Sequence, residues 1–154
     1  MRKLIAAAAL ALTTLSWEGQ SSADDDADEV FVVVNKANPA SALTREDLRP
    51  LFQTTKGEWP DGVKADPVNL ADESVVRHRF DAAVLGLDPD RVARYWVDRK
   101  IRGGERPPRK VSSASAAVRS VASEKGGVAY VLRGDLSPSV KVVAKISSGK
   151  VVSP

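Results

Sequence analysis

The chain has 154 residues, of which 43% are hydrophobic and 28% are charged, so we expect one globular domain and not a disordered segment. It contains no cysteine and a single histidine, His78. This composition excludes disulfides, thiol catalysis, cysteine-bound metals and any site that needs two imidazoles.

The first 23 residues have the order of an export signal. Arg2 and Lys3 precede an apolar and small-residue run over residues 4–15, and small residues around Ala23 offer a cleavage site. The run of 12 residues is shorter than the roughly 20 that span a bilayer. We therefore expect residues 1–23 to be a cleaved signal peptide, which places the protein in the periplasm or outside the cell, with no membrane span once the signal is removed. A retained N-terminal anchor or a buried helix is the alternative.

Charge divides the remaining chain into two unequal parts. Residues 24–29 read DDDADE, which predicts an acidic, disordered leader. From Val30 onward there are 21 Lys or Arg and 14 Asp or Glu, a net charge of +7. Eight of these basic residues lie between Arg91 and Lys110. Such a surface attracts anions or acidic partners, although a solvated helix face followed by a loop has the same composition.

The first predicted elements are a strand and a helix. Residues 30–34 form a continuous run of Val and Phe, which predicts a strand that is covered on both faces. Thr44 and Asp47 have the spacing of a capping box. We therefore expect a helix over residues 44–52, with its leucines and Phe52 on the buried face.

The next segment contains a loop, a short strand and a second helix. Residues 53–66 hold the turn residues of a loop, and Trp59 within it is expected to pack on the core. Residues 66–70 predict a strand. Apolar residues at helical spacing predict a helix over residues 74–85.

A third helix is predicted to begin directly afterwards. Asp88 is a suitable N-cap and Pro89 a suitable first helical residue. Val92, Tyr95 and Trp96 are expected on the inner face of this helix, and a pair of glycines ends it.

The last predicted elements complete an α/β pattern. A short strand is predicted at Val111, and a fourth helix is predicted over residues 113–123. Two further strands are predicted over residues 128–132 and 140–144. Strands that alternate with helices predict an α/β fold, with a central mixed sheet flanked by helices. We expect the folded domain to span residues 30–144 and residues 145–154 to be a flexible tail.

No arrangement typical of an enzyme is visible. His78 lies off the apolar stripe of its helix, between two arginines, and is interpreted as an exposed residue. There is neither a Gly-x-Ser-x-Gly elbow nor a glycine-rich phosphate loop. We therefore predict no enzyme activity, no metal and no cofactor. The export signal, and the lack of a basic stripe interleaved with aromatic residues, also argue against a nucleic-acid partner.

One loop carries a possible binding function. Residues 71–75 connect the second strand to the second helix, at the sheet edge where open α/β sheets bind ligands. Free backbone N–H groups at the start of that helix can hold an oxyanion, and Ser74 can add a hydroxyl donor. The alternative is that Asp72 or Ser74 only caps the helix.

Several segments together resemble a known family, the phosphate-binding proteins of bacterial ABC transporters, which are type 2 periplasmic binding proteins. These segments are the helix over residues 43–52, the turn GEWPDG at 57–62, the strand PVNL at 67–70, the segment GGVAYV at 126–131 and the strand KVV at 141–143. The resemblance spans about residues 30–143 and implies a single lobe of that fold, similar to the family's second lobe. The family holds phosphate in the cleft between two lobes.

The resemblance is weaker at the anion-binding turn. The family's turn reads Arg-Ser-Asp-Gly-Ser-Gly-Thr, whereas residues 70–76 read Leu-Ala-Asp-Glu-Ser-Val-Val. Asp72 and Ser74 match, and Leu70 replaces the arginine. Losing a charge-assisted donor from a buried anion site costs about 1.5–3 kcal/mol per bond. Tight phosphate binding would therefore need compensation from Arg77, from Arg79 or from a second subunit.

These observations lead to two hypotheses. The first is an exported phosphate- or oxyanion-binding-like protein related to ABC transporter solute-binding proteins, which binds weakly or forms half of a site that a homodimer could complete. Its candidate anion-binding residues are Asp72, Ser74, Val75 and Arg77. The alternative is a non-catalytic periplasmic interaction module that docks an acidic protein or an envelope polymer through its basic surface at residues 91–110. Its candidate residues are Arg94, Arg99, Lys100 and Arg102.

Overall fold

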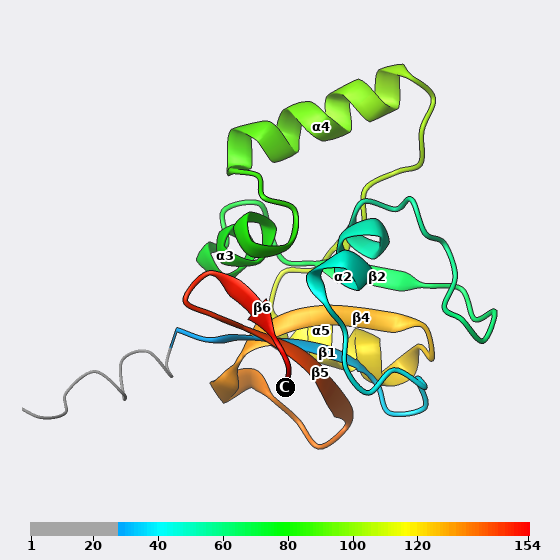
Figure 1. The fold of residues 1–154 in the computed structure, drawn as a ribbon, viewed down its shortest axis with the longest axis vertical. Coiled ribbons are helices and arrows are strands. Elements are labelled where there is room, and N and C mark those ends of the chain that lie inside the picture. The colour runs from blue at the N-terminus through cyan, green and yellow to red at the C-terminus, as the bar shows by residue number, and fades with distance from the viewer. Residues whose placement is uncertain (1–27) are drawn as a thin grey trace, which may run out of the picture.

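A mixed sheet forms the centre of the computed structural model, which describes residues 28–154 (Figure 1). In this part of the chain the sheet has six strands in the order β3-β2-β4-β1-β5-β6. The strands are β1 (Val30–Asn35), β2 (Asp66–Asn69), β3 (Arg109–Lys110), β4 (Gly127–Leu132), β5 (Val140–Ser147) and β6 (Lys150–Val152). The helices are α2 (Arg45–Phe52), α3 (Val75–Val84), α4 (Pro89–Ile101) and α5 (Ala114–Ser123), and a 3₁₀ turn covers Arg133–Asp135. The predicted fold class, an α/β fold with a central mixed sheet flanked by helices, is confirmed.

The strand directions determine where loops gather. β2 runs parallel to both β3 and β4, whereas β1 is antiparallel to β4 and β5, and β6 is antiparallel to β5. The carboxyl ends of β2 and β3 therefore lie at one edge of the sheet, and their amino ends lie at the opposite edge. The β2–α3 loop and the β3–α5 loop both begin at the carboxyl edge.

Helices cover both faces of the sheet, as expected for a central strand made almost entirely of valine. Tyr130 lies opposite Val32 in the sheet and stacks on Phe80 of α3, with 3.9 Å between the ring centroids. Asn35 of β1 points to the other face, where its Nδ2 donates to Val121 O of α5 at 2.9 Å. Because side chains alternate along a strand, these contacts put α3 and α5 on opposite faces.

The predicted helix starts are confirmed. Thr44 and Asp47 form the expected capping box, in which Asp47 Oδ2 accepts from Thr44 N at 2.9 Å. Ser74, Asp88 and Ser113 cap α3, α4 and α5. The loop before β2 is also held as predicted: Trp59 is buried, and its Nε1 donates to Gly126 O at 2.9 Å.

Helix α4 is the least embedded helix of the described chain. It lies beyond α3, at the end of the molecule farthest from the sheet (Figure 1). Val92 is its one buried residue, and Tyr95 and Trp96, predicted on the inner face, are half-buried. Val97 and Ile101 leave 59% and 80% of their surface exposed. The helix is thus attached to the body along one narrow side.

The structure corrects two predicted boundaries. The segment after Lys145, expected to be a flexible tail, continues β5 and returns as β6, because Ser148 and Gly149 adopt the positive φ angles of 48° and 72° that a tight hairpin requires. Glu29, assigned to the disordered leader, is buried and paired with Arg133 at 3.2 Å and Lys145 at 3.1 Å. The predicted signal peptide and residues 24–27 lie outside the described residues. Among residues 28–154, no helix has the length and apolar character needed to cross a bilayer.

Candidate functional site

Asp72 is the centre of a charged cluster at the carboxyl edge of β2 and β3. Its Oδ2 lies 2.6 Å from Lys110 Nζ, and its Oδ1 accepts from Arg77 Nη1. The hydrogen bond from Lys110 is the main reason that the pKa of Asp72 is lowered, and burial opposes this shift. Lys110 reaches Asp72 because β3 pairs in parallel with β2, which sets Lys110 beside Asn69.

Arg77 connects this cluster to a buried carboxylate. The arginine is 6% exposed, and its Nη1 also donates to Leu70 O at 3.0 Å. One helical turn further, Asp81 is 4% exposed, and its Oδ2 lies 3.4 Å from Arg77 Nε. Burial raises the pKa of Asp81 to about 6, although the charge of Arg77 opposes this shift. The guanidinium of Arg77 therefore lies beneath the β2–α3 loop and stabilises it.

The four residues predicted to bind an anion lie together at the start of α3. Ser74 Oγ accepts from Arg77 N at 3.3 Å, so this side chain caps the helix. Val75, the first residue of α3, is 61% exposed, so the helix begins at the surface. The carboxylate of Asp72 bridges the side chains of Arg77 and Lys110. The arrangement thus combines a helix amino end with two cations that are already paired.

Three members of the site were not predicted from the sequence. Lys110 is distant in the chain, and only the pairing of β2 with β3 brings it to Asp72. Asp81 could have been found, because its i, i+4 spacing from Arg77 is that of an ion pair on a helix. His78, predicted to be exposed, is half-buried because its Nε2 lies 2.7 Å from Asp72 O and holds the loop.

A buried hydrogen-bond chain fixes the end of β2 below the site. Tyr130 OH donates to Asn69 Oδ1 at 3.0 Å and accepts from Leu70 N at 3.3 Å. Burial raises the pKa of Tyr130, so the phenol stays protonated and keeps its donor role. The strand end is therefore rigidly placed before the loop begins.

Comparison with known proteins finds solved structures that share the fold. No protein-family model matches the sequence, and neither does any curated protein. Solved structures do match: an ABC-type phosphate transport receptor from Vibrio cholerae has a TM-score of 0.59 at 22% identity. A putative phosphate ABC transporter substrate-binding protein from Clostridium perfringens has a TM-score of 0.61 at 16% identity. A possible phosphate binding protein from Planctomyces limnophilus has a TM-score of 0.53 at 18% identity.

The chain has the fold of one lobe of these binding proteins. The matches cover 74–75% of this chain but only 40–44% of the matched chains, so this chain spans less than half of their length. The predicted single-lobe fold and the resemblance to phosphate ABC transporter substrate-binding proteins are thereby confirmed.

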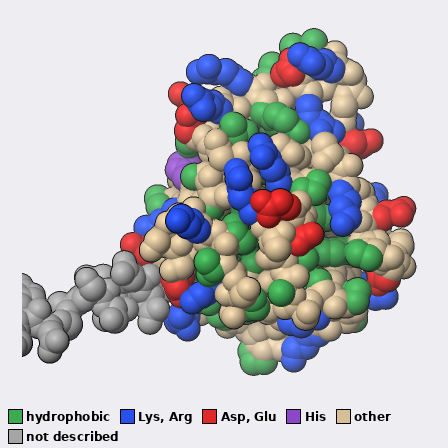
Figure 2. Space-filling view, viewed as in Figure 1, with side chains coloured by type: hydrophobic (Ala, Val, Ile, Leu, Met, Phe, Trp, Pro, Cys, Tyr) green, Lys and Arg blue, Asp and Glu red, His purple; other side chains and the backbone are tan. Residues whose placement is uncertain are grey.

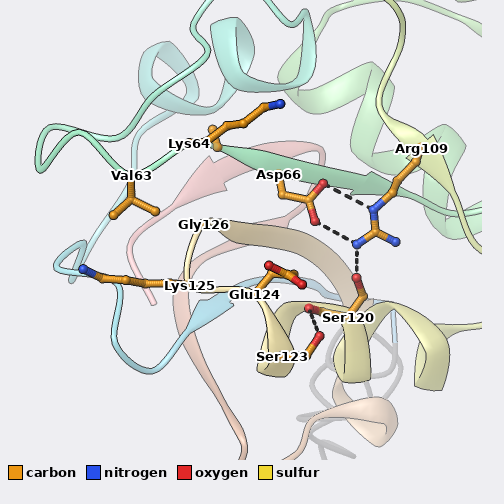
Figure 3. A pocket seen from close by; sticks show the side chains of 10 residues that line it. Val63, Lys64, Asp66, Arg109, Ser120, Ser123, Glu124, Lys125 and Gly126 are labelled. Carbon is orange, nitrogen blue, oxygen red and sulfur yellow. Dashed lines mark hydrogen bonds and ion pairs between the residues drawn. The ribbon is translucent and has the colours of Figure 1, made fainter.

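The opposite edge of the lobe holds a second charged group (Figure 3). Arg109 donates to both carboxylate oxygens of Asp66, at 3.3 Å and 2.8 Å, and also to Ser120 Oγ of α5. The hydrogen bond with Asp66 raises the pKa of Arg109. These residues border an open hollow of about 670 Å³, at the amino ends of the parallel strands. Because the guanidinium of Arg109 binds both the carboxylate of Asp66 and the hydroxyl of Ser120, it holds the ends of β2, β3 and α5 together.

The predicted basic surface lies on α4. Basic side chains gather at both ends of this helix, at the top of the view in Figure 2. Arg94, Lys100 and Arg102 are exposed, and Arg102 Nε lies 3.1 Å from Asp98. Arg99 instead turns inward, with its guanidinium 5.8 Å from the ring centroid of Trp96. Three of the four predicted residues are therefore accessible. Arg99 instead packs on the aromatic side chains of its own helix.

Proposed function

We propose that this protein is an exported solute-binding-like lobe that takes phosphate or another small oxyanion weakly at the start of α3. One observation carries this proposal: Asp72, Ser74, Val75 and Arg77 gather with Lys110 around an open helix start, at the carboxyl edge of β2. Helix amino ends at this edge favour anions, because unpaired backbone N–H groups point out of the helix. The fold shared with phosphate receptors supports the same assignment.

The cluster also explains why we expect weak binding. Asp72 is already paired with both Lys110 and Arg77. A phosphate at the start of α3 must share Lys110 with this carboxylate, and it also faces the exposed Glu73. We therefore assign the main donors to the first-turn amides of α3, with Lys110, whose side chain is 54% exposed, as a cation that can turn toward the anion.

We further propose that a second copy of the chain supplies the other wall of the site. The matched receptors are more than twice as long as the region they share with this chain. In a homodimer the exposed first turn of α3, at Val75, would face the partner, and an anion between the two copies would be shielded from water. Mass in solution with and without phosphate tests this arrangement, and a strictly monomeric protein in saturating phosphate contradicts it.

Isothermal titration with inorganic phosphate at low salt tests the site itself. Ser74→Gly removes the hydroxyl but keeps a tolerated N-cap, so its stability should fall by only a few tenths of a kcal/mol. Lys110→Met removes the cation beside the start of α3. We expect saturable one-site heat that Lys110→Met weakens several-fold and Ser74→Gly weakens less.

Thr44→Ala is the matched control, because Thr44 is also a helix cap but belongs to α2. It should lower stability by about 1 kcal/mol and leave phosphate binding unchanged. An absence of heat up to millimolar phosphate, or equal heat in the chain and the Lys110→Met variant, would overturn the proposal.

A second function is favoured by α4. Its exposed Arg94, Lys100 and Arg102 project from the part of the lobe that is least attached to the sheet. We propose as the alternative that this surface docks an acidic protein or an acidic envelope polymer. Reversing these three charges to Glu should abolish salt-sensitive binding to polyglutamate and leave phosphate heats unchanged. Equal polyglutamate binding by the reversed variant would exclude this alternative.

A further inference from the structure

A cleft between α3 and α4 lies behind the β2–α3 loop. It has a volume of about 350 Å³, within the range of about 300–1,000 Å³ that is common for small-molecule sites. Val92 and Trp96 of α4 and Pro107 and Pro108 of the following segment form apolar walls. The other side carries charged groups, with Arg77 and Asp81 deepest in the fold. The cleft therefore presents an apolar wall opposite a polar one.

Arg77 and Asp81 each keep one polar atom free. Arg77 uses Nη1 for Leu70 O and Asp72 and uses Nε for Asp81, whereas its Nη2 donates to nothing in residues 28–154. Asp81 uses Oδ2, and its Oδ1 accepts from nothing in the same residues. Within this range, Arg99 Nε is the one fully buried side-chain nitrogen or oxygen that lacks a partner. Arg77 Nη2 and Asp81 Oδ1 are therefore reached by solvent, and the cleft is the space that both residues line.

We propose that this cleft binds a small zwitterion that carries an amine and a carboxylate on one carbon, together with an apolar side group, as in an apolar α-amino acid. The carboxylate would accept from Arg77 Nη2, the amine would donate to Asp81 Oδ1, and the side group would lie on Trp96. Arg77 and Asp81 are already in contact at 3.4 Å, so their free atoms suit a ligand whose own opposite charges are adjacent.

The charge balance of the cleft selects for such a ligand. Its lining holds two cations, Arg77 and Lys110, and two carboxylates, Asp72 and Asp81. A ligand with a single charge would add an uncompensated charge to this balanced lining, which is costly in a partly buried cleft, whereas a zwitterion adds no net charge. Inorganic phosphate lacks both the amine and the apolar group. The cleft shares Asp72, Arg77 and Lys110 with the oxyanion proposal, but that proposal takes its main donors from the first-turn amides of α3, whereas this inference uses Arg77 Nη2, Asp81 and the apolar wall.

Isothermal titration of the full chain with three related probes tests the inference. L-Leucine carries both charged groups, isocaproate lacks the amine, and isoamylamine lacks the carboxylate. We expect leucine to bind with a one-to-one stoichiometry, and each of the other two probes to bind at least about tenfold more weakly. Asp81→Asn should cause a similar loss for leucine while leaving isocaproate unaffected.

A variant that fills the cleft tests the site without changing its buried charged residues. Ala93 is an exposed residue of α4 that lines the cleft, so Ala93→Leu should block leucine without altering Arg77 or Asp81. Ala82→Leu is the matched control, because Ala82 is an exposed alanine of α3 that lines other hollows of the surface. It should bind leucine as the unaltered chain does.

Two outcomes would overturn the inference. The first is an absence of leucine heat up to millimolar concentration, and the second is equal leucine binding by the Ala93→Leu variant. Phosphate heat that persists in the Ala93→Leu variant would show that the oxyanion site survives when the cleft site fails, so the two proposals can fail separately.

Discussion

The amino and carboxyl edges of the parallel strands use similar charged residues differently. At the amino edge, Arg109 forms two hydrogen bonds with Asp66 and a third with Ser120, and these residues hold three elements together. At the carboxyl edge, Asp72 bridges Lys110 and Arg77, but Arg77 and Asp81 keep free polar atoms beside a cleft. At the amino edge these polar side chains form hydrogen bonds with one another's elements. At the carboxyl edge a donor and an acceptor stay available to a ligand.

Two adjacent residues of β3 illustrate how the fold produces this difference. Arg109 and Lys110 are neighbours in the chain, and successive side chains of a strand point to opposite faces of the sheet. Arg109 thus meets α5 through Ser120, and Lys110 meets the loop that begins α3 through Asp72. Position in the sheet, and not residue type, decides which basic residue is structural.

The largest effect is expected from Gly126→Ala at the amino edge. A Cβ at this position would lie 1.8 Å from Lys64 O and 2.9 Å from Lys64 C, so the backbone itself must move. The same segment accepts hydrogen bonds from Trp59 Nε1 and from Asp66 N, both at 2.9 Å. We expect a loss of about 3 kcal/mol or more in the free energy of unfolding, measured by urea denaturation.

Gly134→Ala is the control for this prediction. A Cβ at Gly134 meets no atom within 4 Å, and its φ is not in the left-handed region. Its free energy of unfolding should stay within about 0.5 kcal/mol of that of the unaltered chain. If Gly126→Ala is as mild as this control, the amino edge is not the tightly packed region that its contacts indicate.

The sequence predicted the elements better than the site, for a physical reason. Caps such as Thr44 and Ser74 act within a few residues, and the apolar periods that mark α3 and α5 are local as well. The contact between Lys110 and Asp72 depends on β2 and β3 pairing across 38 residues of chain, which no local pattern records. The tail was misjudged because its strand β6 is short and is defined by a hairpin turn at Ser148 and Gly149.

A moderate effect is expected from pH at the carboxyl edge. The pKa of Asp81 is raised from 3.8 to about 6 by burial, while Arg77 and His78 favour its charged form and Asp72 opposes it. The folded protein therefore holds a proton that the unfolded chain has released, and stability falls as the pH rises from about 4 to above 6. Between about pH 5 and pH 7.5 this group should remove about 1–2 kcal/mol of stability.

Asp81→Asn isolates this contribution, because the amide does not titrate. The free energy of unfolding of the variant, relative to that of the unaltered chain, should rise by about 1–2 kcal/mol when the pH is raised from about 5 to about 7.5. Urea denaturation of both proteins at the two pH values gives this difference directly. A difference that does not change with pH would mean that Asp81 keeps an ordinary pKa and is not deeply buried.

The smallest effect, and the sharpest test of the comparison, comes from replacing the two neighbours in β3 by methionine. Arg109→Met removes an ion pair whose partners are 46% and 33% exposed, so we expect a loss of at most about 1 kcal/mol. Lys110→Met removes a pair with 54% and 63% exposure, and the loss of stability should be smaller still.

Phosphate titration should reverse this order, because only Lys110 lies beside the start of α3. If Arg109→Met weakens phosphate binding as much as Lys110→Met does, the two edges are not functionally distinct, and the cations of β3 act only through the net charge of the lobe.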